Sequence, residues 1–449
     1  MTWKAKSFTV WAFLPIDRSN SLTYLDYSDF MRTFLVGGAV RDELLGLPVT
    51  ERDWVVVGET PESLVEKGFK PVGKDFPVFL HPQSREEYAL ARTEQKVAPG
   101  YRGFSIQTSP EVTLEQDLMR RDLTINAIAR DSQGRIIDPY EGRRDIELRL
   151  LRHVSDAFCE DPVRILRVAR FAARYAYLGF RVAAETEALM KSMVEAGEID
   201  ALVPERVWAE FARALGETTP LAFITVLRRC GAYKKLFPEL DRLFGLSLPG
   251  ESYVETDAGR NSLLALENAS RIAENPIIRF AALVHGLGNI ESHPRGFSAG
   301  RNCEAASPTA LNRLCARLRV PGKYRGLAVK VLCCEKLYKE LFHLSAEQIL
   351  DLLHRLNALK KDADLKAFLS TCYAINLGRK DDVLRDFPQR AFLLECQALV
   401  LSVDVRSILM QGFSGAAVGV ELTRRRVLAL ENLIARRSDQ IPDSKKMKI

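Results

Sequence analysis

The sequence lacks the cysteine and histidine patterns that hold zinc or form disulfide frameworks. Its 449 residues include eight cysteines and six histidines, but the cysteines form no Cys-x-x-Cys pair and the histidines are scattered. A zinc site needs ligands clustered at short spacings. We therefore expect reduced thiols that lie mostly in the core, as in a cytoplasmic protein.

Long apolar runs are also missing. No stretch reaches the roughly 18 apolar residues that a membrane-spanning helix requires, so we expect no membrane span. Near the N-terminus, Lys4 and Lys6 precede a short apolar stretch at 7–14, but residues 15–18 supply no small-residue cleavage site for a signal peptide. We expect residues 1–30 to be a loosely held extension or the product of a misassigned upstream start codon.

Low-complexity tracts and internal repeats are absent too, and the composition is that of a folded protein. The hydrophobic content of 47% is enough for about three domains at roughly 150 residues each. The 64 basic and 58 acidic residues give a net charge of +6. This excess favours anionic partners, but it is too small to identify nucleic acid by itself.

Hydrophobic patterns divide the chain into an α+β part and an all-α part. Up to about residue 150, short β-branched runs alternate with helical patterns and turns; these runs are Phe34–Val36, Trp54–Val57, Val78–Leu80, Tyr88–Ala91 and Ile136–Ile137. After Leu150 we expect no further strands. Helical periodicity is expected over Val163–Tyr177, Glu185–Glu195, Val207–Leu215, Leu263–Ile272, Pro276–Val284, Ala310–Leu318, Ala346–Leu359 and Val420–Arg437.

Two segments rich in Ser, Gly, Asn and Pro, 246–261 and 287–308, are predicted to be surface loops, with a domain boundary near 240–260. The C-terminal segment 421–449 carries eight basic residues against four acidic ones. This local excess suits phosphate contacts, although a solvated terminal helix would have the same composition.

Arginine is concentrated in one segment. Residues 117–170 contain eleven arginines and no lysine, against ten acidic residues. Arginine is preferred where planar, bidentate contacts are made, which favours nucleotide recognition. A structural network of ion pairs is the alternative.

A glycine turn and a carboxylate pair form the first candidate site. Gly37-Gly38 follows an apolar strand and leads into a helical pattern, so its N–H groups could bind an anion. Glu51 and Asp53 follow about a dozen residues later and alternate on one face of a predicted strand. Such a pair could bind a divalent metal that bridges a triphosphate, or it could be a solvated edge.

Four ordered motifs resemble those of the class II tRNA nucleotidyltransferases, the CCA-adding enzymes. These motifs are Phe34–Gly46, Glu51–Asp53, Arg120–Ala127 and Glu160–Arg164, and the likeness continues from Pro204–Trp208 to Glu421–Arg426. The resemblance spans residues 33 to about 437 and is closest to the bacterial multifunctional type. The head motifs alone are shared with bacterial poly(A) polymerases.

The resemblance implies that CMP, CMP and AMP are joined to a tRNA 3′ end. The terminal hydroxyl would attack the α-phosphate of CTP or ATP, and two Mg²⁺ ions would clamp the attacking and leaving oxygens. It assigns the metal ions to Glu51 and Asp53, with Glu87 as a third carboxylate. It assigns triphosphate and ribose contacts to Gly38, Arg41, Arg121, Arg167 and Arg170.

The same resemblance makes Asp161 and Arg164 the readers of the base. Cytosine and adenine both present an amino donor beside a bare ring nitrogen, so a carboxylate and a guanidinium match both, whereas uracil and guanine invert this order. The alternative is that Asp161 only caps a helix that begins with Pro162. By resemblance, Gln95–Phe104 would be a flexible loop that closes on the nucleotide.

The implied organisation is an α+β nucleotidyltransferase head with a small mixed sheet, followed by helical modules. The expected parts are an extension at 1–30, the head at 31–150, a neck with the base reader at 151–240, a body at 241–359 and a tRNA-binding tail at 360–449.

The chain departs from the family pattern at two places. The first metal ligand is Glu51 where the family usually has Asp, and a shift of about 1 Å can cost on the order of 100-fold in rate.

The body of the multifunctional type carries a metal-dependent HD phosphohydrolase site with an adjacent His-Asp. Here the matching residues are His285 and Gly286, the upstream histidine is replaced by Asn261, and His293 cannot rebuild the site alone. We expect a scaffold without phosphohydrolase activity.

Three functions follow as hypotheses. The leading one is Mg²⁺-dependent CCA addition to tRNA with CTP and ATP as substrates. A poly(A) polymerase would use ATP alone on general RNA ends. A catalytically weakened tRNA-binding protein is suggested by Glu51, Gly286 and Asn261 together.

Overall fold

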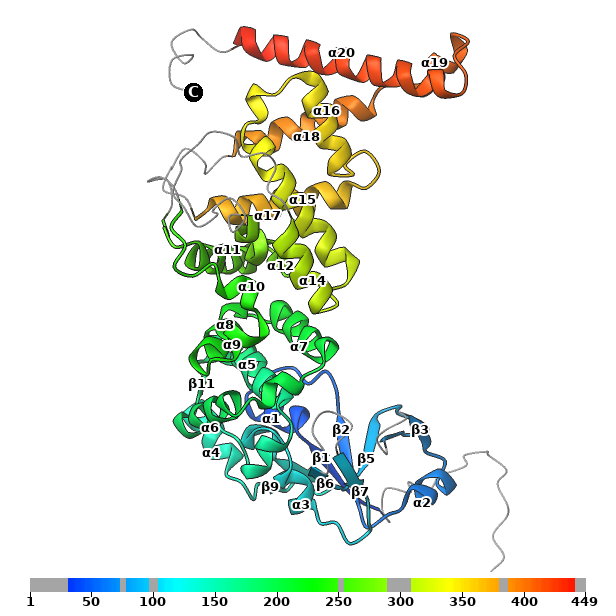
Figure 1. Ribbon diagram of the computed structural model, residues 1–449. Coiled ribbons are helices and arrows are strands. Elements are labelled where there is room, and N and C mark those ends of the chain that lie inside the picture. The colour runs from blue at the N-terminus through cyan, green and yellow to red at the C-terminus, as the bar shows by residue number, and fades with distance from the viewer. Residues whose placement is uncertain are drawn as a thin grey trace, which may run out of the picture.

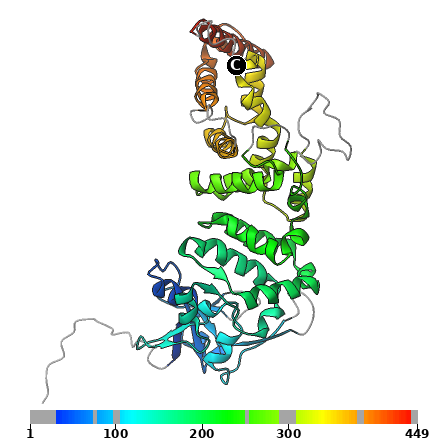
Figure 2. The ribbon, with the colours of Figure 1, turned by 90° about the vertical axis from the view of Figure 1, so that its left-hand side faces the viewer.

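The computed structural model describes residues 31–72, 78–96, 104–248, 254–288, 308–378 and 387–440. The extension predicted at 1–30, most of the predicted flexible loop and His293 lie outside these ranges. The described part is elongated, with the strands gathered at one end and the last helix at the other (Figure 1). A view from the side shows helices following one another between these two ends (Figure 2).

The N-terminal part contains a mixed seven-stranded sheet, as expected. Its order is β3-β4-β5-β2-β1-β8-β9, with bounds β1 Arg32–Val36, β2 Asp53–Val57, β3 Lys70–Val72, β4 Val78–Leu80, β5 Glu87–Leu90, β8 Ala129–Asp131 and β9 Ile136–Ile137. Every neighbouring pair is antiparallel except β2 and β5, which run parallel. Because of this parallel pair, the beginnings of β2 and β5 lie at the same edge of the sheet.

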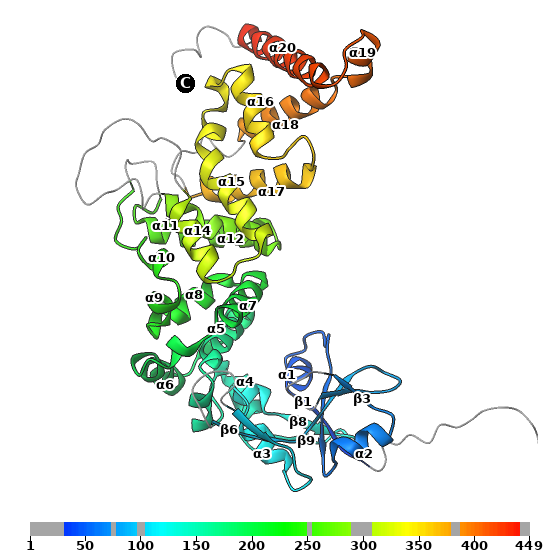
Figure 3. The same cartoon turned by 45° about the vertical axis from the view of Figure 1, so that its right-hand side comes forward.

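Apolar side chains cover both faces of the sheet, because successive residues of a strand point to opposite sides. Leu35 packs in the large cluster that includes α1 (Gly38–Leu44), whereas Phe34 and Val36 pack with α3 (Leu114–Met119). Figure 3 shows α1 next to β1. A third cluster packs α2 (Pro61–Glu66) against the sheet through Leu64. The sheet is therefore held rigidly from both sides.

Smaller elements complete the head. A separate hairpin pairs β6 (Thr93–Lys96) with β7 (Phe104–Gln107), and the 3-10 turn η2 (Thr124–Asn126) and helix α4 (Gly142–Leu148) follow. The expectation that strands stop at Leu150 is wrong in one detail. β10 (Leu150–Leu151) pairs in parallel with β11 (Arg181–Val182), so the chain after the first neck helix returns to the head.

The rest of the described chain is helical, as predicted. The neck contains the 3-10 turns η3 (Asp156–Glu160), η4 (Ala176–Leu178) and η5 (Glu198–Ala201), with α5 Val163–Tyr175, α6 Ala184–Glu195, α7 Pro204–Gly216, α8 Pro220–Arg229, α9 Ala232–Leu236 and α10 Pro238–Asp241. Further on lie α11 Ala258–Ile272, α12 Pro276–Val284, η6 His285–Leu287, α14 Thr309–Arg317, α15 Gly322–Lys339, η7 Leu341–His343, α16 Ala346–Arg355, α17 Asp362–Asn376, α18 Pro388–Leu401, α19 Val405–Met410 and α20 Ala416–Gln440. No described helix has the length and apolar character needed to cross a bilayer.

Local chemistry explains where several of these helices begin. Proline occupies the first turn of α7, α8 and α12, where its missing N–H is not needed. Asp257 caps α11 by accepting a hydrogen bond from the N–H of Arg260. The predicted loop 246–261 therefore ends earlier than expected, because this cap starts the helix at Ala258.

Candidate active site

A cleft of about 1700 Å³ lies between the sheet of the head and the helices of the neck. All ten residues singled out from the sequence for nucleotide or metal binding line it, namely Gly38, Arg41, Glu51, Asp53, Glu87, Arg121, Asp161, Arg164, Arg167 and Arg170. They come from segments more than a hundred residues apart in the chain. The structure thus gathers the predicted set into one place, while their individual roles stay predictions.

Strand pairing places the carboxylates on the head side of the cleft. Asp53 stands opposite Glu87 in the parallel β2–β5 pair and opposite Val36 in the antiparallel β1–β2 pair, next to the glycine turn. Glu51 lies two residues before β2 begins. Withdrawal from solvent raises the pKa of Asp53, the nearby Arg121 lowers it, and the neighbouring Glu51 raises it, with a net increase. The two carboxylates therefore repel each other in the absence of a cation.

The donors fit a divalent metal ion in part. Carboxylate oxygens are the hard ligands that such an ion prefers, and its charge would relieve the repulsion between Glu51 and Asp53. Within the described ranges, however, no three His, Cys, Asp or Glu side chains gather closely enough to hold a metal ion. The predicted trio of Glu51, Asp53 and Glu87 thus shares one wall of the cleft without converging on one point.

Two guanidinium groups, those of Arg121 and Arg41, lie close to the glycine turn. Gly37 has a φ of +66°, a left-handed conformation that favours glycine, and a Cβ at this position would lie 2.8 Å from Nη1 of Arg121. Gly38 has a less crowded position, with a Cβ 3.4 Å from Nη2 of Arg41. Glycine at these positions allows both guanidinium groups to approach the turn.

The guanidinium of Arg121 is held in place by a buried carboxylate, that of Asp117. Asp117, which has no exposed surface, accepts hydrogen bonds from Arg120 at 2.6 Å and from Arg121 at 3.2 Å. Burial alone would raise the pKa of Asp117, but the two arginines lower it below its ordinary value. The buried Nε of Arg121 has no hydrogen-bond partner among the described residues. Asp117 thus holds the guanidinium of Arg121 on the side away from the cleft.

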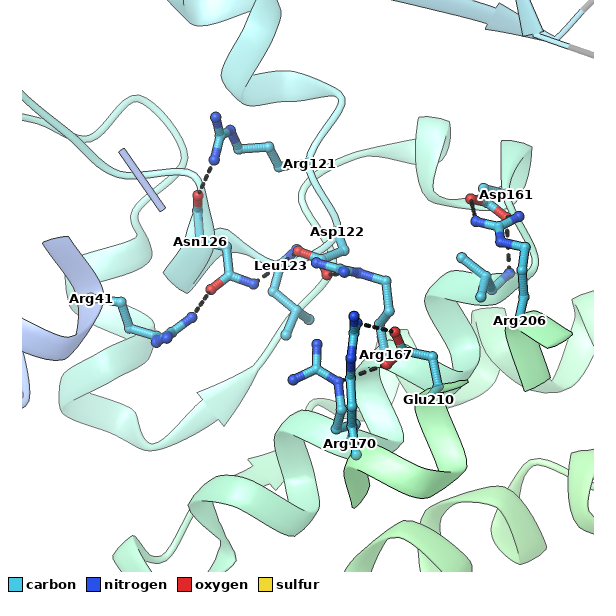
Figure 4. Close-up of polar contacts among 12 residues, drawn as sticks. Arg41, Arg121, Asp122, Leu123, Asn126, Asp161, Arg167, Arg170, Arg206 and Glu210 are labelled. Carbon is cyan, nitrogen blue, oxygen red and sulfur yellow. Dashed lines mark hydrogen bonds and ion pairs between the residues drawn. The ribbon is translucent and has the colours of Figure 1, made fainter. Parts of the chain in front are cut away.

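Each arginine on the α5 stripe has an internal acceptor. Arg164 donates to the carbonyl of Ala157 at 2.6 Å. The other pairs, two of them drawn in Figure 4, are Arg167 with Asp122 at 2.7 Å, Arg170 with Glu210 at 2.6 Å and Arg174 with Asp42 at 3.2 Å. The four arginines also line the cleft. The stripe is thus an ion-pair network and a cationic wall at once, so the two interpretations of the arginine-rich segment are compatible.

Asp161 makes the capping contact of the alternative interpretation, and its assignment as a base reader stays a prediction. One carboxylate oxygen accepts the N–H of Val163 at 3.0 Å, which is a capping contact at the start of α5. The carboxylate also pairs with both terminal nitrogens of Arg206, at 3.1 and 2.7 Å (Figure 4). A bidentate pair of this kind fixes the plane of the carboxylate.

Sequence reasoning missed the partners of these residues. Arg206, Asp42 and Asn126 lie within motifs that carry the resemblance, but the resemblance assigns no role to them. No sequence pattern points to Glu210 or Glu217, which face Arg170. Only the three-dimensional contacts identify these residues.

A second predicted region lies in the body, at His285. Its Nε2 is 3.2 Å from Oδ1 of Asn261, and its Nδ1 is 2.7 Å from the carbonyl of Ala282. The two positions matched from the sequence thus do lie side by side. A Cβ on Gly286 would lie 2.6 Å from Oγ of Ser262, so an aspartate at this position would require the Ser262 side chain to shift.

Taken together, the cleft has the carboxylates Glu51, Asp53 and Glu87 on its head side and arginines on both sides. Arginine binds phosphate oxygens through paired N–H groups, and carboxylates bind divalent cations. This combination fits a nucleoside triphosphate with its metal ion.

Comparison with known proteins agrees with this chemistry. The family model described as "Poly A polymerase head domain" matches residues 33–152, and that described as "Probable RNA and SrmB- binding site of polymerase A" matches residues 179–244. A multifunctional CCA protein of Methylococcus capsulatus is 55% identical over 413 residues, covering 92% of this chain and 97% of the relative. Another, from Thioalkalivibrio sulfidiphilus, is 52% identical over 405 residues, covering 90% and 99%.

Solved structures share the fold. A CCA-adding enzyme in complex with CTP has a TM-score of 0.59 at 23% identity, covering 90% of this chain and 89% of the other. The Thermotoga maritima CCA-adding enzyme complexed with tRNA has a TM-score of 0.58 at 19% identity, covering 90% and 88%. At these identities the likeness supports the fold alone.

The buried pair of Asp122 and Arg167 predicts a pH dependence of stability. Burial would raise the pKa of Asp122, but Arg167, Asn126 and Arg164 lower it to about 2 from 3.8. A lowered pKa stabilises the fold above pH 3.8, and this contribution is lost as the pH falls towards 2. The free energy of unfolding of the wild type, relative to Asp122→Asn, should therefore decrease by about 1 kcal/mol between pH 6 and pH 3. Urea unfolding at both pH values tests this, and a difference independent of pH would contradict it.

Proposed function

The chain belongs to the family of multifunctional CCA proteins, and on this premise we propose that it adds C, C and A to the 3′ end of tRNA without a nucleic-acid template. CTP and ATP would be the nucleotide substrates and tRNA the acceptor. The observation that carries the proposal is that β2–β5 pairing and the α5 stripe bring Asp53 and the neck arginines to the same cleft.

Members of this family are nucleotidyltransferases that require a divalent metal ion, and we propose Mg²⁺ as that ion here. Bound at Glu51 and Asp53, it would neutralise charge on the phosphates and lower the pKa of the attacking hydroxyl. Glu87, opposite Asp53, would support this side of the cleft. Since no described trio of carboxylates converges, the nucleotide's own phosphate oxygens would complete the coordination.

The arginines would orient the nucleotide for in-line attack. Arg41 and Arg121 lie at the glycine turn, where they would bind the triphosphate with the N–H groups of Gly38. Arg167 and Arg170 on the opposite wall would bind phosphate or ribose with the N–H groups that their internal pairs leave unused. The internal pairs hold these guanidinium groups in place before the substrate arrives, which lowers the cost of ordering them.

Asp161 and Arg164 would read the base. The pair with Arg206 and the contact with Ala157 fix the directions of both groups. A fixed acceptor beside a fixed donor would match cytosine and adenine and oppose uracil and guanine.

The predicted domains supply the remaining parts. The head at 31–150 would carry the transfer chemistry and the neck at 151–240 the base reader, while the body at 241–359 would space them from the tail at 360–449.

In the tail, Arg424 and Arg425 pair with Glu421, so part of the basic excess on α20 is neutralised internally. Arg437 likewise pairs with Glu395 at 2.9 Å, whereas the exposed Arg436 near the end of α20 would add to a surface for the tRNA backbone. The reduced cysteines fit the cytoplasm, where tRNA is matured.

Incubation of a tRNA that lacks its 3′ CCA with CTP, ATP and Mg²⁺ tests the main proposal. We expect three nucleotides to be added, and Asp53→Asn should reduce the rate at least 100-fold because it removes a metal ligand. Asp131→Asn, at a partly buried head carboxylate that does not line the cleft, is the control. Failure of the wild type to extend the tRNA would refute the proposal, and a long A-only product would point to a poly(A) polymerase.

The Glu51 substitution has its own test in the same assay. If Glu51 serves as a ligand, Glu51→Asp should change the rate by less than about tenfold. A large gain in rate would instead identify the natural protein as catalytically weakened.

Base selection tests the assignment of Arg164. Arg164→Ala should relax the choice of CTP and ATP over UTP and GTP, because the reader would lose its donor. Arg279→Ala is a matched control, since Arg279 is also buried and donates to main-chain carbonyls but does not line the cleft. Unchanged selection in Arg164→Ala would show that the assignment is wrong.

We also propose that the body has no phosphohydrolase activity. His285 is bonded to Asn261 and to a main-chain carbonyl, and an aspartate at position 286 would require the Ser262 side chain to shift. The purified protein should therefore not hydrolyse 2′,3′-cyclic phosphates with added Mn²⁺ or Ni²⁺, and Gly286→Asp alone should not create the activity. Metal-dependent turnover that disappears in His285→Ala would overturn this.

A further inference from the structure

Asp42 is a buried carboxylate directly behind the wall of the cleft. It is 5% exposed and does not line the cleft, unlike its neighbour Arg41. Its Oδ1 lies 2.9 Å from both Nε and Nη2 of Arg41 and accepts the hydroxyl of Tyr175 at 2.8 Å. Its Oδ2 accepts Nη2 of Arg174 at 3.2 Å. One carboxylate thus joins α1 of the head to the end of α5 in the neck.

Tyr175 acts only as a donor in this group. Burial raises the pKa of its hydroxyl well above the ordinary value, so the hydroxyl stays protonated at any working pH. Its ring also lies under Arg41, with the guanidinium carbon 5.1 Å from the ring centre and 5.3 Å from that of Phe171. Arg41 is therefore held along one edge by Asp42 and across one face by two rings of α5.

The other edge of Arg41 is bound to the head. Nη1 of Arg41 donates to Oδ1 of Asn126, whose Nδ2 donates to Asp122 at 2.9 Å, and Asp122 accepts Arg167 at 2.7 Å (Figure 4). The chain of contacts starts at Tyr175 on α5 and returns to the same helix at Arg167, about two turns earlier. The contacts form a closed polar ring across the head–neck junction.

Some N–H groups of the Arg41 guanidinium are not used in this ring. A guanidinium has five N–H groups. Nε donates one to Asp42 and Nη1 donates one to Asn126, so three have no hydrogen-bond partner among the described residues, while Nη2 also contacts Asp42 as an ion pair at 2.9 Å. One of the nitrogens that keep a free N–H, Nη2, would lie 3.4 Å from a Cβ at Gly38. The free donors of Nη2 are thus located at the glycine turn.

We propose that Asp42 is a positioning residue, through which Tyr175 and Arg174 of the neck fix the guanidinium of Arg41 for the triphosphate. This inference rests on the proposed function for the identity of the ligand. Asp42 itself touches no substrate, because Arg41 separates it from the cleft. Its effect should therefore appear in nucleotide affinity and should vanish when Arg41 is absent.

The test measures dissociation constants of CTP by calorimetry, with inorganic tripolyphosphate as a second probe. Asp42→Asn should weaken CTP binding about tenfold, since it removes a charge-assisted bond to Arg41. Tyr175→Phe keeps the ring and removes only the hydroxyl, and it should weaken binding about threefold. This milder variant keeps the proposal testable if Asp42→Asn folds poorly.

Asp145→Asn is the matched control. Asp145 is also a buried head carboxylate, 3% exposed, which accepts Thr124 at 2.7 Å and Arg152 at 3.0 Å but does not line the cleft. Both Asp→Asn variants should lower the melting temperature. Only Asp42→Asn should change the CTP dissociation constant by more than about twofold.

A double-mutant cycle gives the decisive result. In an Arg41→Ala background, adding Asp42→Asn should change the CTP dissociation constant by less than about twofold. Additive effects of the two substitutions, or equal weakening by Asp145→Asn, would overturn the proposal. Binding of tripolyphosphate without binding of CTP would refute the proposed function and leave the positioning role intact, so the two failures can be told apart.

Discussion

The junction between head and neck depends on one constraint, which is that a charge removed from water must be paired. α5 carries a row of arginines into this junction, and Arg164 and Arg170 are almost completely buried. Losing one partner of a buried pair typically costs about 3–5 kcal/mol. The carboxylates that supply the pairs come from α1, from the segment before η2 and from α7. Each pair therefore ties a different element to the same helix.

This pairing also explains why the segment 117–170 uses arginine and excludes lysine. A guanidinium is planar and has donors on two edges, so one edge can bond to an internal carboxylate while the other faces the cleft. The ammonium of lysine has no such second edge in a fixed direction. The network that stabilises the junction and the wall that faces the nucleotide are thus made by the same side chains. A cleft built in this way needs little rearrangement when an anion enters.

The sequence predicts much of this arrangement, up to the point where it depends on distant contacts. Periodicity and proline starts locate the strands and helices, and the spacing of Glu51 and Asp53 predicts the carboxylate pair. Glu87 came only from the resemblance, since its place beside Asp53 depends on the pairing of β2 with β5. The partners of the arginines are not predictable from the sequence, because Glu210 lies 40 residues from Arg170 and Asp42 lies 132 residues from Arg174. No local pattern encodes such separations.

The fold of the body depends on apolar packing rather than on the polar residues around His285. In α12, residues 280–284 are at most 1% exposed. Trp208 of the neck packs edge-on against two aromatic rings, with ring centroids 5.5 Å apart for Phe280 and 4.9 Å apart for Tyr324. Burial of this kind contributes roughly 1.5–3 kcal/mol for each large side chain. Against this sum, the single hydrogen bond between His285 and Asn261 adds about 1 kcal/mol. The body is therefore held by apolar packing that continues into the neck. Substitutions at Asn261 and Gly286 can remove a ligand set without changing the spacing between the cleft and α20.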